Sequence, residues 1–257
     1  MTRNTAHALS FGKAVTEYER GRPGYPIEAI DWIRAEVAGA AVAGVPLTVV
    51  DIGAGTGKFT AALLGYGDEV IAVEPDAAMR AALAGKFPEV RALEGTGEAL
   101  PLDDGIADLV TFAQAWHWVE VPAASAEVAR VLKPGGALAL VWNIRDERVD
   151  WVARLGQIMG TSAAEDYDSV TPPVASPLQT TSHAEFFWDN PVSRDGLLAM
   201  VTSRSYIITM EPDARAEVLR DIEALLDGHP DLAGQTRYTM PYVTRVTLAR
   251  AGSPDRT

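Results

Sequence analysis

A glycine-rich turn is the part of this sequence best suited to bind a ligand. Residues 50–57 read Val-Asp-Ile-Gly-Ala-Gly-Thr-Gly, so that Asp51 lies in an apolar run and Gly53, Ala54 and Gly55 follow it. Glycines at this spacing remove Cβ atoms where a ligand must lie against the backbone. A tight turn without a ligand is the alternative, but turns after the first strand of such sheets usually face one.

An acidic residue follows this turn at a distance typical of nucleoside binding. Glu74 lies 23 residues after Asp51, where a carboxylate can accept hydrogen bonds from both hydroxyl groups of a ribose. Lys58 occupies the position at which the nicotinamide fingerprint requires its third glycine, so a dehydrogenase fits less well. The spacing therefore predicts an adenosine-type ligand. Pro75 fixes the next turn, and Met79 could border a purine ring, although core packing explains Met79 equally well.

Three further candidates follow the fourth apolar run. Ala113, Gln114 and His117 lie where open α/β sheets bind ligands, at the carboxyl ends of the strands. His117 is a candidate general base. We favour the alternative, a hydrogen-bonded wall of the pocket, because a lone histidine is weak evidence for proton transfer.

Seven short apolar segments must position these residues. The first five are separated by helical or turn-rich stretches, which favours parallel strands joined by crossovers. We therefore predict an α/β fold: a Rossmann-like, seven-stranded, mostly parallel sheet with helices on both faces, an antiparallel last strand and a small helical cap. The predicted strands are 47–52, 70–73, 90–93, 109–112, 138–142, 185–188 and 242–248.

The chain length predicts a single domain over residues 1–257, because one hydrophobic core can still serve a chain of this size. Within it we expect an N-terminal helical segment (1–45), a ligand-binding core (46–145), a region that completes the sheet and supplies pocket helices (146–236), and a final edge strand (237–250). Residues 169–182 are predicted to form a surface loop, because they are rich in proline, serine and threonine.

The composition narrows the classes of partner. The formal net charge of −13 opposes binding to nucleic acids and to anionic membrane surfaces. The sequence has no cysteine, and its four histidines are far apart, so no metal site is expected. No signal peptide or membrane-spanning run is evident, which makes cytoplasmic localisation the expectation.

Four motifs in order resemble those of the class I S-adenosylmethionine-dependent methyltransferases. They are the turn at 50–57, Val73-Glu-Pro-Asp76, Glu98-Ala-Leu-Pro-Leu102 and Leu132-Lys-Pro-Gly-Gly136. The resemblance spans residues 51–143. It implies S-adenosylmethionine as the cofactor and S-adenosylhomocysteine as the product.

The resemblance also implies roles for individual residues. Asp51, Gly53, Ala54 and Gly55 would contact the methionine part of the cofactor, and Glu74 would hold its ribose. Many relatives have aspartate where Thr96 stands, so adenine would be held mainly by the backbone of Gly97 and Glu98. A threonine hydroxyl can still accept a hydrogen bond.

A narrower resemblance extends toward both ends of the chain. Arg22-Pro-Gly-Tyr-Pro26, Ala115-Trp-His-Trp118 and Trp142-Asn-Ile-Arg-Asp146 are similar to a small-molecule subgroup related to trans-aconitate methyltransferases. This likeness implies that Tyr18 and Arg22 close over the cofactor. Packing of an N-terminal helix on the domain explains Arg22 equally well.

The sequence thus predicts methylation of a small molecule, with the oxygen of a carboxylate or hydroxyl favoured as the acceptor. A nucleotide-dependent oxidoreductase, a protein or nucleic-acid methyltransferase and a non-catalytic cofactor-binding regulator are the alternatives. Binding of reduced nicotinamide dinucleotide distinguishes the first, and the acidic charge opposes nucleic-acid substrates. The sequence does not exclude a non-catalytic regulator, because the motifs indicate cofactor binding more directly than they indicate catalysis. The sequence does not decide between a monomer and a homodimer.

Overall fold

The computed structural model describes residues 22–38, 46–160, 172–202 and 204–252. Its sheet has seven strands in the order β3-β2-β1-β4-β5-β7-β6. The strands are β1 (Thr48–Ile52), β2 (Glu69–Val73), β3 (Arg91–Leu93), β4 (Ala107–Ala113), β5 (Leu132–Arg145), β6 (Leu178–Ser193) and β7 (Arg237–Ala251). The described α-helices are α3 (Ile27–Ala38), α4 (Lys58–Leu63), α5 (Ala77–Lys86), α6 (Val121–Val131), α7 (Asp150–Met159), α8 (Arg194–Thr202), α9 (Ser205–Ile208) and α10 (Pro212–Gly228).

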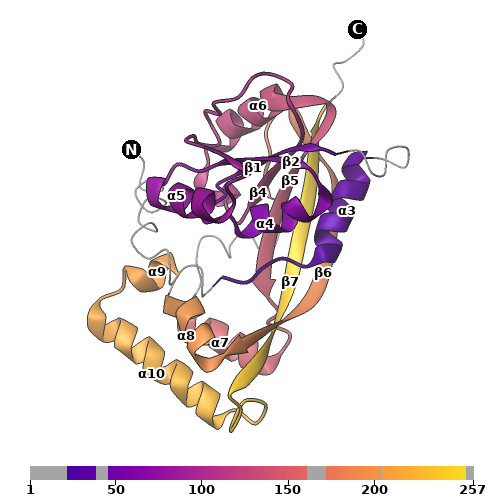
Figure 1. Cartoon of the computed structure of the whole chain (residues 1–257). Helices are drawn as coiled ribbons and strands as arrows, with labels where there is room; N and C mark the ends of the chain where they lie inside the picture. Colours follow the sequence, from indigo (N-terminus) through magenta and orange to yellow (C-terminus); the bar gives the residue numbers. More distant parts are fainter. Residues whose placement is uncertain (1–21, 39–45, 161–171, 203, 253–257) are drawn as a thin grey trace.

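Helices cover both faces of the sheet, as predicted (Figure 1). Alternate residues of a strand point to opposite faces. Val49 of β1 therefore packs with residues of α3 and α4, whereas its neighbour Val50 packs in the cluster that contains Val128 of α6. Most residues of β1, β2 and β4 are buried on both faces, which explains why these segments are largely apolar in the sequence.

Local residues explain where two of the crossover helices begin. Asp76 precedes α5, and its Oδ1 accepts hydrogen bonds from the backbone N–H groups of Ala78 (2.9 Å) and Met79 (3.0 Å). Pro122 lies in the first turn of α6, where its missing N–H costs no helical hydrogen bond. These local signals fix the end of β2 and the start of α5, next to Glu74. None of the helices in the described ranges combines the length and hydropathy needed to cross a bilayer.

The last strand is antiparallel, as predicted, but the prediction that residues 237–250 form an edge strand is wrong. β7 lies between β5 and β6 and pairs antiparallel with both, so β6 is the edge strand. Val246, Thr247 and Leu248 are all buried, and a run buried on both faces belongs inside a sheet. The predicted surface loop at 169–182 is also too long, because β6 begins at Leu178.

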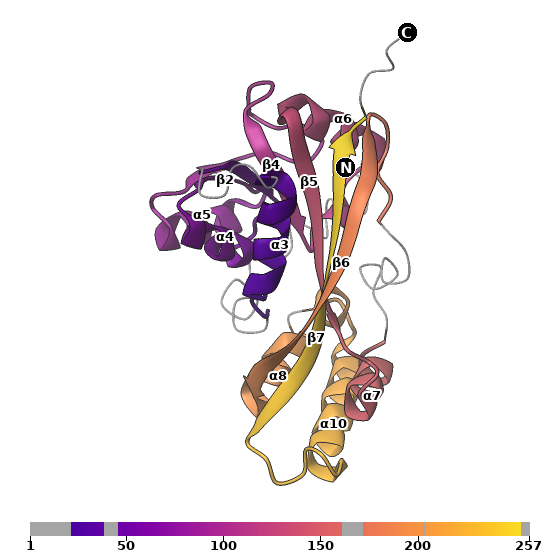
Figure 2. The same ribbon diagram turned by 90° about the vertical axis from the view of Figure 1, so that its right-hand side faces the viewer.

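The ends of β6 and β7 extend beyond the rest of the sheet. β5 pairs only with residues 242–249 of β7, whereas β6 pairs with β7 as far as Arg237. The overhanging ribbon is surrounded by α7, α8 and α10, which form a separate lobe (Figure 2). Its apolar centre includes Leu155, Leu197, Ile222 and Met240. This lobe is the predicted helical cap. It lies next to the carboxyl ends of β1 and β4, because its residues line a pocket together with residues at those strand ends.

Candidate functional site

A pocket lies where the glycine-rich turn, the end of β4 and the segment before α3 meet. We call it the inner chamber. It contains six of the residues singled out in the sequence, namely Arg22, Asp51, Gly53, Ala54, Ala113 and Gln114. The other lining residues are Pro23, Tyr25, Thr56, Lys58, Phe59, Asn143, Arg204 and Tyr242. Segments far apart in the sequence therefore meet at one site.

The glycine turn is held tightly against the neighbouring strand. The N–H groups of Gly53 and Ala54 both donate to the carbonyl oxygen of Val73, at 2.8 and 3.3 Å. Gly53 has a φ of +65°, and a Cβ added there would lie 2.6 Å from the Cβ of Ala115. Only glycine fits this position, because the conformation and the space both exclude a side chain.

Glu74 supports the same turn from the end of β2. Its side chain is buried, and its two carboxylate oxygens accept hydrogen bonds from the N–H groups of Gly55 and Asp76, both at 2.8 Å. Burial raises the pKa of Glu74, and these two hydrogen bonds oppose that rise. Each oxygen keeps a second lone pair. Glu74 can therefore hold the turn and still accept hydrogen bonds from a ligand.

Asp51 is a fully buried acid beneath the turn. Its carboxylate accepts hydrogen bonds from the hydroxyls of Thr60 (2.7 Å) and Thr111 (2.9 Å), which come from α4 and β4. Burial is the largest influence and raises the pKa of Asp51 to about 6, although both hydroxyls favour the ionised form. Asp51 thus ties three elements together at the base of the inner chamber.

Thr56 is a feature of the chamber that the sequence did not single out. It is 1% exposed, and its Oγ1 makes no hydrogen bond with any residue that the structure describes. A buried hydroxyl without a partner carries an energetic cost of about 1–3 kcal/mol, which a polar ligand can remove. Thr56 therefore suits a ligand that carries charged or polar groups beside the glycine turn.

A polar network anchors the segment before α3 to the sheet. The side-chain amide of Gln114 donates to the carbonyl oxygen of Asn143 (2.8 Å), and the amide of Asn143 donates to the carbonyl oxygen of Gly24 (2.8 Å). The hydroxyl of Thr244 donates to the Oδ1 of Asn143 (2.6 Å). Gln114 has an unusual φ of +57°. This network fixes the backbone beside Arg22 over the inner chamber.

Asn143, Tyr25 and Tyr242 also line the chamber, and sequence reasoning did not assign them to the site. Asn143 follows the apolar part of β5, so its position at a strand end was a usable signal. Tyr25 lies in the quoted Arg22–Pro26 motif. Tyr242 gives no such signal, because it reaches the chamber only through the pairing of β7 with β5.

Glu74, Gly55 and four further predicted residues lie outside the lining of the inner chamber. Met79 lies in the first turn of α5 with its side chain buried, and its N–H donates to the cap residue Asp76. Gly97 and Glu98 form the tip of a turn closed by hydrogen bonds between Thr96 and Ala99, and Pro75 lies beside Glu74. Tyr18 is outside the described residues.

His117 belongs to the short helical turn after β4 and does not line the inner chamber. Burial, assisted by the positive charge of Arg22, lowers the pKa of His117 to about 4. The imidazole is therefore neutral at pH 7 and is a weak base. Its neighbour Trp116 is fully buried, packs edge-on against Phe112 and donates to the carbonyl oxygen of Pro173 (2.8 Å), so it is a core residue.

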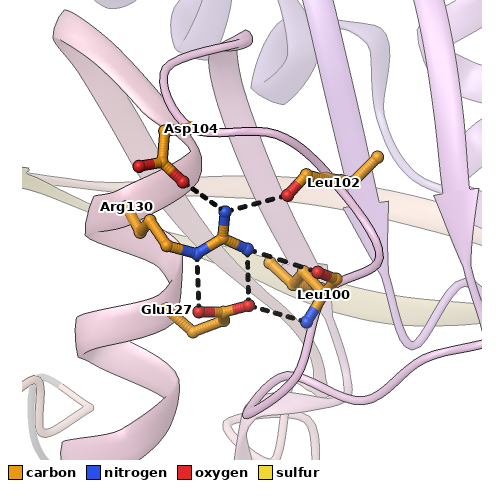
Figure 3. Close-up of polar contacts among 5 residues, drawn as sticks. All are labelled: Leu100, Leu102, Asp104, Glu127 and Arg130. Carbon is orange, nitrogen blue, oxygen red and sulfur yellow. Dashed lines mark hydrogen bonds and ion pairs between the residues drawn. The ribbon is translucent and has the colours of Figure 1, made fainter.

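The loop after Glu98 is fastened to α6 by Arg130 (Figure 3). The Arg130 guanidinium donates to both carboxylate oxygens of Glu127 (2.9 and 2.7 Å) and to the carbonyl oxygen of Leu102 (2.8 Å). It also contacts the carboxylate of Asp104 and the carbonyl oxygen of Leu100. Glu127 in turn accepts a hydrogen bond from the N–H of Leu100 (2.8 Å). This clamp adds polar contacts to a loop whose Leu100 and Leu102 side chains are buried in the core.

Replacement of Arg130 by methionine is expected to reduce the free energy of unfolding by about 1–2 kcal/mol, because Glu127 and two carbonyl oxygens lose their donor. Thermal and urea unfolding would measure the change. Arg91→Met is the control, because Arg91 is exposed and makes no ion pair within the described residues. Equal stability of the two variants would contradict a structural role for the clamp.

The chain is similar in sequence to known methyltransferases. Residues 50–140 match a family model described as a methyltransferase domain. An uncharacterised methyltransferase of Mycobacterium tuberculosis is 46% identical over 245 residues, which cover 94% of this chain and 97% of the relative. The malonyl-[acyl-carrier protein] O-methyltransferase of Methylococcus capsulatus is 32% identical over 143 residues, or 51% of this chain and 49% of that protein.

A solved structure shares the fold over nearly the whole chain. It is a protein from Anaeromyxobacter dehalogenans that is described as a type II methyltransferase. The TM-score is 0.64 at 22% sequence identity, and the match covers 90% of this chain and 97% of that one. The similarity extends past the family-model match into the region of the helical lobe.

Proposed function

Because the chain belongs to the S-adenosylmethionine-dependent methyltransferases, we propose that it methylates an oxygen atom of a small acceptor, a carboxylate in preference to a hydroxyl. The observation that carries the proposal is the inner chamber, which is lined by the glycine turn, the end of β4 and Thr56, whose hydroxyl has no hydrogen-bond partner among the described residues. The chamber lies at the carboxyl ends of the strands, where such sheets bind ligands.

The residues of the chamber fit the cofactor's chemical groups. The backbone of Gly53 and Ala54 and the hydroxyl of Thr56 would hold the methionine part, and Arg22 would pair with its carboxylate. Glu74 would accept hydrogen bonds from the ribose hydroxyls through its remaining lone pairs. The turn at 97–98, together with Pro75 and Met79, would border adenine, and Asp51, Ala113 and Gln114 would shape the floor. Tyr18 would close over the cofactor.

The neutral, weakly basic His117 favours a carboxylate acceptor. When bound, the cofactor supplies a methyl group that is already activated on a positively charged sulfur. An acceptor oxygen bound beside it would take this methyl group, and sulfur would keep the electron pair of the broken carbon–sulfur bond. A carboxylate is ionised at pH 7 and needs no base, whereas a hydroxyl must release its proton to one.

The likeness to trans-aconitate methyltransferases supports the same preference. So does the relative from Methylococcus capsulatus, whose name describes O-methylation of a malonyl group. In this proposal His117 is a hydrogen-bonding wall near Arg22, and the chain's task is to position the acceptor and exclude water.

Calorimetric titration with S-adenosylhomocysteine tests the proposal, with a nicotinamide dinucleotide as the control ligand. We expect binding of the first and no heat from the second. A screen of small carboxylic acids with labelled S-adenosylmethionine then tests transfer, and the product should be a methyl ester that is hydrolysed by alkali. Absence of S-adenosylhomocysteine binding would sink the proposal, and an alkali-stable product would refute esterification.

A further inference from the structure

A second chamber adjoins the inner one, and we call it the outer chamber. It has a volume of about 370 Å³ and shares Arg22, Pro23, Lys58 and Tyr242 with the inner chamber. Its other lining residues come from the segment before α3, the overhanging ends of β6 and β7, and α8. The remaining lining residues are Gly24, Asn190, Pro191, Val192, Ser193, Gly196, Leu197, Met200, Arg237 and Met240.

The outer chamber has a charge opposite to that of the protein as a whole. Arg22, Lys58 and Arg237 line it, and none of the described lining residues is aspartate or glutamate. The chain carries a formal net charge of −13, with 35 acidic and 22 basic residues. A concave site of one sign raises the local concentration of ligands of the opposite sign.

Two of these basic side chains have no acidic partner among the residues that the structure describes. Lys58 is partly buried, burial lowers its pKa, and its ammonium makes no hydrogen bond or ion pair within the described part of the chain. Arg237 likewise has no ion pair among the residues that the structure describes. Arg194, next to the chamber, differs, because its guanidinium contacts the carboxylate of Asp227 at 2.5 Å.

The cofactor does not bring the negative charge that would offset Lys58 and Arg237. S-adenosylmethionine has two positive groups, the sulfonium and the ammonium, and a single carboxylate, for which Arg22 is the proposed partner. Its binding would therefore add positive charge beside Lys58. A bound anion would offset this excess, and guanidinium and ammonium groups are the usual partners of carboxylates and phosphates.

We propose that the outer chamber binds an organic anion as the methyl acceptor, with a carboxylate or phosphate group held between Lys58 and Arg237. The inference rests on the proposed function and specifies its substrate class. Lys58 lies at the junction of the two chambers, so an acceptor held there can reach the inner chamber. Met200, Leu197 and Met240 would contact the apolar part of the acceptor.

Titration with simple probe anions tests the outer chamber directly. Succinate, its neutral analogue succinamide and inorganic phosphate are titrated by calorimetry into the full chain, with and without S-adenosylhomocysteine. The variants are Lys58→Gln and Arg237→Gln. Arg220→Gln is the matched control, because Arg220 is exposed on α10 and lies outside both chambers.

We expect succinate to bind the wild type more tightly than succinamide does, and each chamber variant to weaken succinate binding at least about tenfold. The Arg220→Gln variant should match the wild type, and all variants should retain their affinity for S-adenosylhomocysteine. Comparable binding of phosphate indicates a general anion site, whereas binding of succinate alone assigns a carboxylate to the acceptor.

Equal binding of succinate and succinamide, or unchanged succinate binding in both chamber variants, overturns the proposal. Loss of S-adenosylhomocysteine binding in Lys58→Gln would assign Lys58 to the cofactor and overturn its role here. If the wild type does not bind S-adenosylhomocysteine, the proposed function fails, and succinate titration of the protein alone still decides whether the anion site exists.

Discussion

Replacement of Glu74 by glutamine is expected to weaken binding of S-adenosylhomocysteine by about 100-fold. Two ribose hydroxyls would donate to the carboxylate, and each hydrogen bond to a charged group contributes about 1.5 kcal/mol. Their combined loss of about 3 kcal/mol corresponds to roughly 100-fold in the dissociation constant. Calorimetry on wild type and variant measures the ratio.

The design must separate ribose binding from support of the turn, because Glu74 also accepts hydrogen bonds from Gly55 and Asp76. In glutamine one oxygen can still accept from a backbone N–H, but the side-chain NH2 group faces the other N–H donor. A modest fall in melting temperature is therefore expected. Asp76→Asn is the matched control. It removes a negative charge from the same loop and keeps an oxygen that can cap α5.

A folded Glu74→Gln protein that binds S-adenosylhomocysteine as tightly as the wild type would contradict the ribose assignment. Equal weakening in the Asp76→Asn protein would show that the effect comes from the charge of the loop. Far-ultraviolet circular dichroism at the titration temperature establishes that each protein is folded.

Replacement of Asp51 by asparagine is expected to change how stability depends on pH. The buried carboxyl has a pKa of about 6 instead of its usual 3.8, so the folded state favours its protonated form. Its contribution to stability is present below about pH 4 and is lost as pH rises toward the folded pKa near 6. The difference of about 2 pKa units corresponds to about 3 kcal/mol.

Asparagine has no carboxyl to ionise, so the Asp51→Asn protein should gain about 3 kcal/mol relative to the wild type between pH 4 and pH 7. Urea unfolding at a series of pH values measures this difference for the protein without ligand. Asp103→Asn is the control, because Asp103 is exposed and should give a nearly constant difference. A constant difference for Asp51→Asn as well would refute the raised pKa.

The parallel part of the fold could be predicted because its signals are local. Each of the first five strands contains a short apolar run, and Asp76 and Pro122 mark the starts of two of the helices between them. The turn at 50–57 and Glu74 likewise follow from residue type and spacing. These features depend on backbone conformation and burial within a few residues.

The position of β7 could not be predicted from the sequence. Alternation in residues 242–248 indicated a strand but not its neighbours, because an edge strand and an inserted antiparallel strand can share a pattern. Pairing of β7 depends on contacts between residues 44 to 73 positions apart for β6 and 97 to 111 positions apart for β5. The start of β6 could not be predicted either, because most of its first residues are polar and only their pairing with β7 makes them a strand.

The sequence by itself determined the parallel core, the glycine turn and the acid at its side, because strand burial and backbone geometry demand those residue types locally. Only the tertiary structure decided that Asn143 fastens Gly24 over the inner chamber and that Lys58 and Arg237 line one outer chamber. Charge and hydrogen bonding at these positions act through space between separate elements. Lys58 and Arg237 come together only because β7 pairs inside the sheet and places the helical lobe beside the glycine turn.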